Sequence, residues 1–134
     1  MEKKDLKPAG VFKYFEEICQ VPLPSKKEEK MIAYLKAFGA KHNLETKVDE
    51  AGNVLIKKPA TPGKENLQTV VLQSHIDMVC EKNNDVQHDF LTDPIETEID
   101  GEWLKAKGTT LGADNGIGVA TELAIPVAYT HLTL

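Results

Sequence analysis

The chain has 134 residues and a formal net charge of −5, with 41% hydrophobic and 28% charged residues, which is the composition of an ordinary globular domain. A protein that grips phosphates needs a basic surface, so the excess of acidic residues argues against nucleic acid as a partner. No apolar run approaches the ~20 residues needed to cross a bilayer, so we expect no membrane partner.

The N-terminus is charged and is not followed by the apolar run of a signal peptide, which predicts an intracellular, cytoplasmic protein. Its two cysteines, Cys19 and Cys80, are far apart in the sequence, a pattern that favours reduced thiols over a disulfide framework. We interpret Cys80 as a small buried residue, since a catalytic thiol needs an adjacent base that the sequence does not show.

The first third of the chain predicts two helices. Apolar residues recur at helical spacing within residues 6–19, and prolines interrupt the pattern after that point. Ser25 and Glu28 form a capping-box pattern in front of a second apolar stripe. This pattern predicts an amphipathic helix from about Lys26 to Lys41.

The remainder predicts strands and a final helix. Alternating residues indicate one hairpin over 45–49 and 54–57, and a second over 95–99 and 102–106. The continuous apolar run 69–74 is typical of a strand that is covered on both faces. A glycine-rich loop, 108–118, leads into a helix. Helices alternating with strands predict an α/β fold, a mixed sheet with flanking helices.

A histidine and an aspartate follow the apolar run directly. His75 and Asp77 are separated by one residue, so on an extended chain their side chains point to the same side. A neutral imidazole binds zinc-like ions, and a nearby carboxylate orients it. The alternative is an ordinary polar strand end, since this triplet also occurs by chance.

Asp114 lies between glycines just before the last predicted helix. Glycines allow tight turns, so this carboxylate can be aimed into a cleft, where its two oxygens can bridge cations ~3.5–4 Å apart. The alternative is that Asp114, Asn115 and Gly116 form a helix cap with turn residues. A phosphate-binding loop is disfavoured, because no lysine occupies the P-loop position and Asp114 would repel the phosphate.

Three segments taken together carry a family resemblance: VVLQSHIDMVCEK at 70–82, DPI at 93–95 and GTTLGADNG at 108–116. They resemble the aminoacyl-histidine dipeptidases, also called cytosolic non-specific dipeptidases. These enzymes belong to the zinc metallopeptidase group that includes aminoacylases and glutamate carboxypeptidases. The similarity runs from about Leu6 to Ala124. It implies a metal-dependent dipeptidase that acts on Xaa-His or other small dipeptides, and a homodimer for the full-length protein.

The resemblance also implies roles for individual residues. His75 would be a metal ligand, and Asp114 a carboxylate that bridges two metal ions, with a cis peptide bond to Asn115. Asp77 would be the catalytic-site carboxylate that holds the His75 imidazole. The cofactors would be two divalent metal ions, zinc in the first place, with manganese or cobalt as alternatives. The metal pair would activate a water, and a glutamate would take its proton.

Only two of the five expected ligands, and no general-base glutamate, match this sequence. We therefore interpret residues 1–124 as the N-terminal part of a partial zinc-peptidase-like catalytic domain that is inactive alone. Residues 125–134 form an atypical tail of artefactual origin, in which Pro126 should end the helix and His131 is a poor ligand candidate. The alternatives are a non-catalytic metal-binding or interaction module, and another hydrolase of the same group. His88 is expected to be a solvated surface residue.

Overall fold

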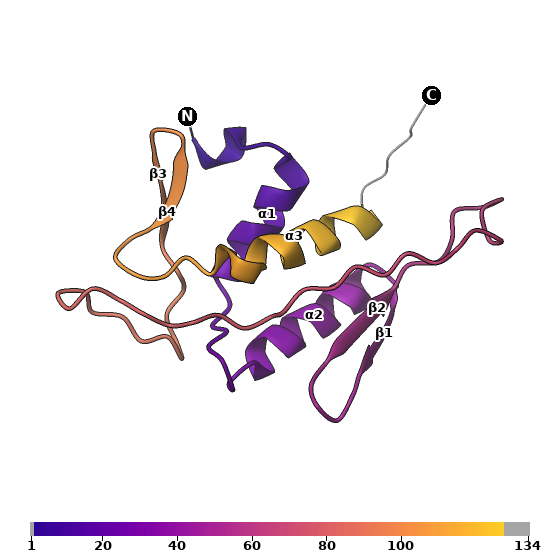
Figure 1. Ribbon diagram of the computed structural model, residues 1–134, viewed down its shortest axis with the longest axis horizontal. Coiled ribbons are helices and arrows are strands. Elements are labelled where there is room, and N and C mark those ends of the chain that lie inside the picture. The colour runs from indigo at the N-terminus through magenta and orange to yellow at the C-terminus, as the bar shows by residue number, and fades with distance from the viewer. Residues whose placement is uncertain (1, 128–134) are drawn as a thin grey trace.

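A computed structural model describes residues 2–127 of the chain. Figure 1 shows helices gathered around one core and two separate hairpins, joined by a long irregular segment. The elements in chain order are η1 (Lys3–Asp5), α1 (Ala9–Cys19), α2 (Glu29–Lys41), β1 (Glu45–Val48), β2 (Val54–Lys57), β3 (Thr97–Asp100), β4 (Trp103–Ala106) and α3 (Ala113–Val127). The α/β fold class expected from the sequence is confirmed, although the described strands form two antiparallel pairs, β1–β2 and β3–β4.

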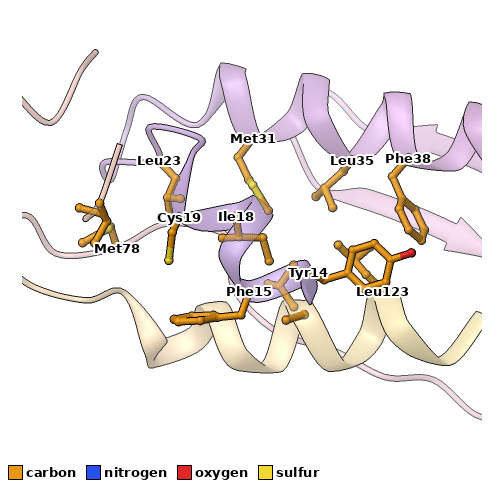
Figure 2. Close-up of a cluster of buried hydrophobic side chains, with 13 residues drawn as sticks. Tyr14, Phe15, Ile18, Cys19, Leu23, Met31, Leu35, Phe38, Met78 and Leu123 are labelled. Carbon is orange, nitrogen blue, oxygen red and sulfur yellow. The ribbon is translucent and has the colours of Figure 1, made fainter. Parts of the chain in front are cut away.

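The core lies between α1, α2 and α3, as the close-up in Figure 2 shows. Phe15 on α1 and Met31 on α2 are 1% and 0% exposed, and Leu123 reaches them from α3. Burying a side chain of this size contributes about 1.5–3 kcal/mol relative to leaving it in water. The apolar stripes that predicted the helices are therefore the faces that hold them together.

The first hairpin packs beside α2, and its turn is stabilised by one carboxylate. Asp49 Oδ1 accepts from the N–H groups of Ala51 at 3.0 Å and Asn53 at 2.8 Å. Gly52 has a φ of 87°, which only glycine adopts without strain. These bonds explain why the predicted turn forms where it does.

The second hairpin is tied to α1. The buried Thr97 hydroxyl donates to Glu16 Oε1 at 2.8 Å, and the Lys3 ammonium contacts both side chains. Just before β3, the Ile95 N–H donates to the Cys19 carbonyl at 2.8 Å. Both predicted hairpins are thus present, with bounds shifted by one or two residues.

Three details differ from the sequence-based expectations. Residues 69–74 form no strand, because no described segment offers them a hydrogen-bonding edge. Helix α2 begins at Glu29 rather than near Lys26, because Lys26 has a left-handed φ of 67° that a helix cannot include. Helix α3 continues past Pro126 to Val127. The rest of the expected tail, with His131, lies outside the described residues.

Over residues 2–127, no helix combines the length and the apolar character needed to span a membrane. The expected division at residue 124 falls inside α3.

Candidate metal centre

The segment 75–77 is fixed at both of its ends. On its downstream side, the Met78 N–H donates to the Leu23 carbonyl at 3.0 Å and forms part of an isolated parallel bridge. On its upstream side, the Ser74 hydroxyl donates to Glu122 of α3 at 2.8 Å. A site segment without strand neighbours is therefore still anchored to the core.

The glycine-rich loop lies against this segment. Thr110 uses its N–H to bond the Glu81 carbonyl and its hydroxyl to bond the Val79 carbonyl, both at 2.8 Å. Gly112 has a φ of 74°, and a β-carbon built there would lie 3.0 Å from the Met78 sulfur. The loop that leads to Asp114 can approach so closely only because glycine occupies this position.

Asp114 and Asn115 stand at the start of α3 in a non-helical conformation. The peptide bond between them is cis, as the resemblance implied. The Asn115 side-chain oxygen accepts from the Gly118 N–H at 3.2 Å and so caps the first turn. The Asp114 side chain is directed outward and is 97% exposed.

These elements place one imidazole between two carboxylates. His75 Nδ1 lies 3.0 Å from Asp77 Oδ1, and His75 Nε2 lies 3.0 Å from Asp114 Oδ1. His75 Nδ1 also lies 3.1 Å from the Asp77 carbonyl, so the Nδ1 side faces two acceptors. Sequence reasoning selected these three residues, and the structure brings all of them together.

The two carboxylates act on the imidazole in the same direction. The hydrogen bond to Asp114, with a further contribution from Asp77, raises the pKa of His75 above its usual range. The pKa of Asp77 is lowered, first by a hydrogen bond from the Ser25 hydroxyl and then by His75. With a proton on Nδ1, Nε2 and Asp114 would both be acceptors, so a cation is needed between them: a second proton or a metal ion.

This donor set fits a zinc-type ion. It offers an imidazole nitrogen and, 3.0 Å from it, the exposed carboxylate of Asp114. Within residues 2–127, no group of three or more histidine, cysteine or acidic side chains is arranged to hold one metal ion. The described residues therefore supply part of a ligand set. An open cavity of about 770 Å³ borders the site and is lined by His75, Asp77 and Asn115, with the turn of the first hairpin opposite.

The remaining candidates do not join this site. The His88 ring packs against Phe90 at a centroid distance of 4.4 Å. It is half-buried rather than solvated, and its Nε2 is buried without a hydrogen-bond partner in the part of the chain that is described. Burial raises the pKa of the Cys80 thiol, which opposes a role as a nucleophile.

Sequence reasoning missed two residues that shape the site, Ser25 and Thr110. Ser25 was assigned to a helix cap, but its hydroxyl donates to Asp77 instead. Thr110 carried no signal beyond its place in a glycine-rich loop. Both act through contacts between segments far apart in the sequence, which periodicity cannot reveal.

Comparison with known proteins identifies relatives over most of the chain. Over 124 residues, 92% of its length, it is 51% identical to the cytosol non-specific dipeptidase of Escherichia coli. Its structure matches the crystal structure of the aminoacylhistidine dipeptidase of Vibrio alginolyticus with a TM-score of 0.91 and 52% identity over 96% of the chain. The chain is homologous to the aminoacyl-histidine dipeptidases. The resemblance read from the three motifs is thereby confirmed.

The similarity covers part of each relative. The chain spans 26% of the length of both dipeptidases. A tripeptidase from Staphylococcus aureus matches with a TM-score of 0.70 at 20% identity, over 87% of this chain and 31% of the tripeptidase, which shows a shared fold alone. No family model matches the chain. The two relatives that are about half identical to this chain are dipeptidases.

Proposed function

We propose that this chain forms part of the active site of a two-metal dipeptidase that hydrolyses the peptide bond of small dipeptides, Xaa-His or others. The observation that carries the proposal is the His75 imidazole, which stands 3.0 Å from the carboxylates of Asp77 and Asp114 at once. When the Nδ1 proton is directed at Asp77, a second proton or a metal ion between Nε2 and Asp114 satisfies that arrangement. The names of the relatives supply the substrate class.

Each residue has a distinct part in this proposal. His75 would hold one divalent ion through Nε2, and the Asp114 carboxylate would be shared between the two ions. Asp77 accepts the Nδ1 proton and keeps the imidazole oriented. Bound zinc, or manganese or cobalt, would supply an activated water and polarise the scissile carbonyl.

Among the described residues, no three histidine, cysteine or acidic side chains are arranged to hold one metal ion. We propose that a glutamate base and the remaining ligands come from polypeptide outside these 134 residues, so that the chain by itself does not turn over dipeptides. Two ligands hold a divalent ion weakly, because affinity rises with the number of preformed ligands. We also propose a cytosolic whole protein, in line with the name of the Escherichia coli relative. That the whole protein is a homodimer is a proposal that rests on the family resemblance alone.

A non-catalytic metal-binding module is the second candidate. The partial ligand set within residues 2–127 favours it, because two ligands can hold an ion without performing catalysis. The two functions differ in a simple way. If the dipeptidase function is correct, the protein that contains this chain hydrolyses dipeptides. If the chain is a binding module, it binds metal without any hydrolysis.

Cobalt titration followed by nuclear magnetic resonance tests the centre directly. Paramagnetic shifts should be confined to amides around His75 and Asp114, and His75→Ala should abolish them. His42→Asn is the matched control, since His42 packs on Phe38 at the end of α2. If His42→Asn abolishes the paramagnetic shifts, or if the shifts remain in His75→Ala, the metal does not bind at His75 and the proposed centre is wrong.

The enzymatic part needs a second measurement. The protein that contains this chain should hydrolyse dipeptides, lose the activity with a chelator and regain it with zinc. Metal binding at His75 without any hydrolysis would leave the binding module as the function. Hydrolysis that a chelator does not affect would contradict the two-metal mechanism.

A further inference from the structure

The chain just before α2 lies directly beside the site segment. Leu23 accepts the Met78 N–H at 3.0 Å, and the Ser25 N–H donates to the Met78 carbonyl at 3.3 Å. Leu23 and Met78 are both buried in the core, where Figure 2 shows them close together. Pro24 thus pairs with Met78, and Ser25 is held beside the site segment although 52 positions separate it from Asp77.

The side chains continue this pairing. The Ser25 hydroxyl donates to Asp77 Oδ2, while Asp77 Oδ1 faces His75 Nδ1 at 3.0 Å. Each carboxylate oxygen therefore has its own partner, and the plane of the carboxylate is fixed at two points. The Ser25 oxygen also lies 3.3 Å from the Met78 carbonyl. A hydroxyl has one proton, and the charged carboxylate is the stronger acceptor for it.

The local backbone is arranged for this contact rather than for a helix start. Lys26 has a φ of 67°, an unfavourable value for a residue with a side chain, and its N–H donates to Glu28 Oε1 at 2.6 Å. Helix α2 then begins at Glu29 without a side-chain cap. The serine is consequently available to Asp77, and the backbone bonds to Met78 hold the chain in that position despite the strain at Lys26.

We propose that Ser25 is a positioning residue of the candidate metal centre: by fixing the carboxylate of Asp77, it holds the Nδ1–H tautomer of His75 and directs Nε2 toward Asp114 and a divalent cation. Without the hydroxyl, Asp77 can rotate toward water, and the imidazole can donate from Nε2 to Asp114 instead. The metal part of this inference rests on the proposed function. The tautomer part does not require any metal.

The test compares two variants of nearly the same shape. Ser25→Thr keeps the hydroxyl, whereas Ser25→Val replaces it by a methyl group, and Ser25 is exposed enough to accept both. Long-range ¹H–¹⁵N spectra of the metal-free chain report the tautomer of neutral His75. We expect the Nδ1–H form in the wild type and in Ser25→Thr, and a mixture in Ser25→Val.

Cobalt affinity at His75 is the second readout. Loss of a residue that orients a metal-bound histidine typically costs about 10–100-fold in affinity. Ser25 acts one step further away, so Ser25→Val should lower the affinity by about 3–10-fold and Ser25→Thr should restore it. Thr92→Ala is the control, since it removes a hydroxyl that bonds another aspartate, Asp93, at 3.1 Å.

The outcomes separate this inference from the proposed function. If Ser25→Val keeps the wild-type tautomer, or if Ser25→Thr fails to restore it, Ser25 is not a positioning residue. A lowered Tm in Ser25→Val with an unchanged tautomer would likewise mean a purely structural role and overturn the inference. If the wild type binds no cobalt at His75, the proposed metal centre fails, while the tautomers of the two variants still decide the role of Ser25.

Discussion

At the scale of single residues, Asp114 acts on the His75 imidazole through a hydrogen bond. Its hydrogen bond is the largest cause of the raised pKa of His75, and Asn cannot supply the same charge. We expect Asp114→Asn to lower the pKa of His75 and to abolish cobalt shifts at this residue. Titration of the His75 ring protons by nuclear magnetic resonance measures the change, and an unaltered pKa would show that the two side chains do not interact in solution.

Cys19 makes folding stability depend on alkaline pH. Burial, with the charge of Glu16, raises its pKa from 9.0 to about 12. Because the folded-state pKa lies above the unfolded value, the stabilising effect is complete below about pH 9 and is lost as the pH rises toward 12. The free energy of unfolding should fall by about 1.4 kcal/mol per pH unit in this window.

Urea unfolding at pH 8 and pH 10 can isolate this contribution. Cys19→Ala removes the thiol, so its stability should fall less between the two pH values than that of the wild type. Tyrosine ionisation is common to both proteins and cancels in the comparison. Equal slopes would mean that the Cys19 thiol is not buried in solution.

The candidate site residues differed in how far the sequence could predict them. His75 and Asp77 share one side of an extended chain, and glycines flank Asp114, so local spacing was informative. Ser25 was misread because a serine three residues before a glutamate also fits a capping box. Its true partner, Asp77, lies 52 positions away, and a contact of that kind depends on the folded backbone rather than on any local pattern.

At the scale of elements, the position of Asp114 depends on how the glycine-rich loop packs against Met78. Gly112→Ala would place a methyl group 3.0 Å from the Met78 sulfur and would force a left-handed φ on alanine. We expect a loss of about 1–3 kcal/mol in stability and weaker cobalt binding, because the loop that carries Asp114 must shift. Thermal unfolding and cobalt titration measure the two effects.

Gly101→Ala is the matched control for this prediction. Gly101 also has a left-handed φ, 61°, but a β-carbon there would meet no atom within 4 Å. Gly101→Ala should therefore lose stability from backbone strain alone and leave cobalt binding unchanged. If both variants weaken cobalt binding equally, the contact between Gly112 and Met78 is not what positions Asp114.

Helices and hairpins were predictable because their signals are local. The apolar stripes of α1 and α2 and the turns of both hairpins lie within short stretches of sequence. The run 69–74 carries an equally strong strand pattern, yet a strand also needs a neighbour with which to exchange hydrogen bonds. Within residues 2–127 that neighbouring strand is missing. The sequence therefore predicted that residues 69–74 favour an extended strand, but not that they would stay unpaired.

At the scale of the whole molecule, that segment leaves an apolar strip on the surface. Val70 and Val71 are each 79% exposed, with Leu67 and Leu72 beside them. Exposed apolar segments with unpaired backbone groups promote association. We expect the isolated chain to associate as its concentration rises, which sedimentation velocity would detect.

A charged side chain on this strip should reduce the association. Val71→Lys places a positive charge in the strip, and like charges on two copies repel each other. Thr61→Lys adds the same charge in an exposed loop and serves as the control. Association that Thr61→Lys reduces as much as Val71→Lys does would reflect net charge, not this segment.

Oxidation of Met78 would damage the candidate site without modifying any of its polar residues. Met78 follows Asp77 in the sequence, and its thioether packs against Gly112. The Met78 side chain is shielded from solvent in the folded state. Peroxide that reaches it during a transient opening would form a sulfoxide, which adds a polar oxygen where the loop leaves no room. The loop and Asp114 would then be displaced, and a methionine sulfoxide reductase could reverse the injury. Oxidative stress would therefore disable the candidate centre through its hydrophobic support.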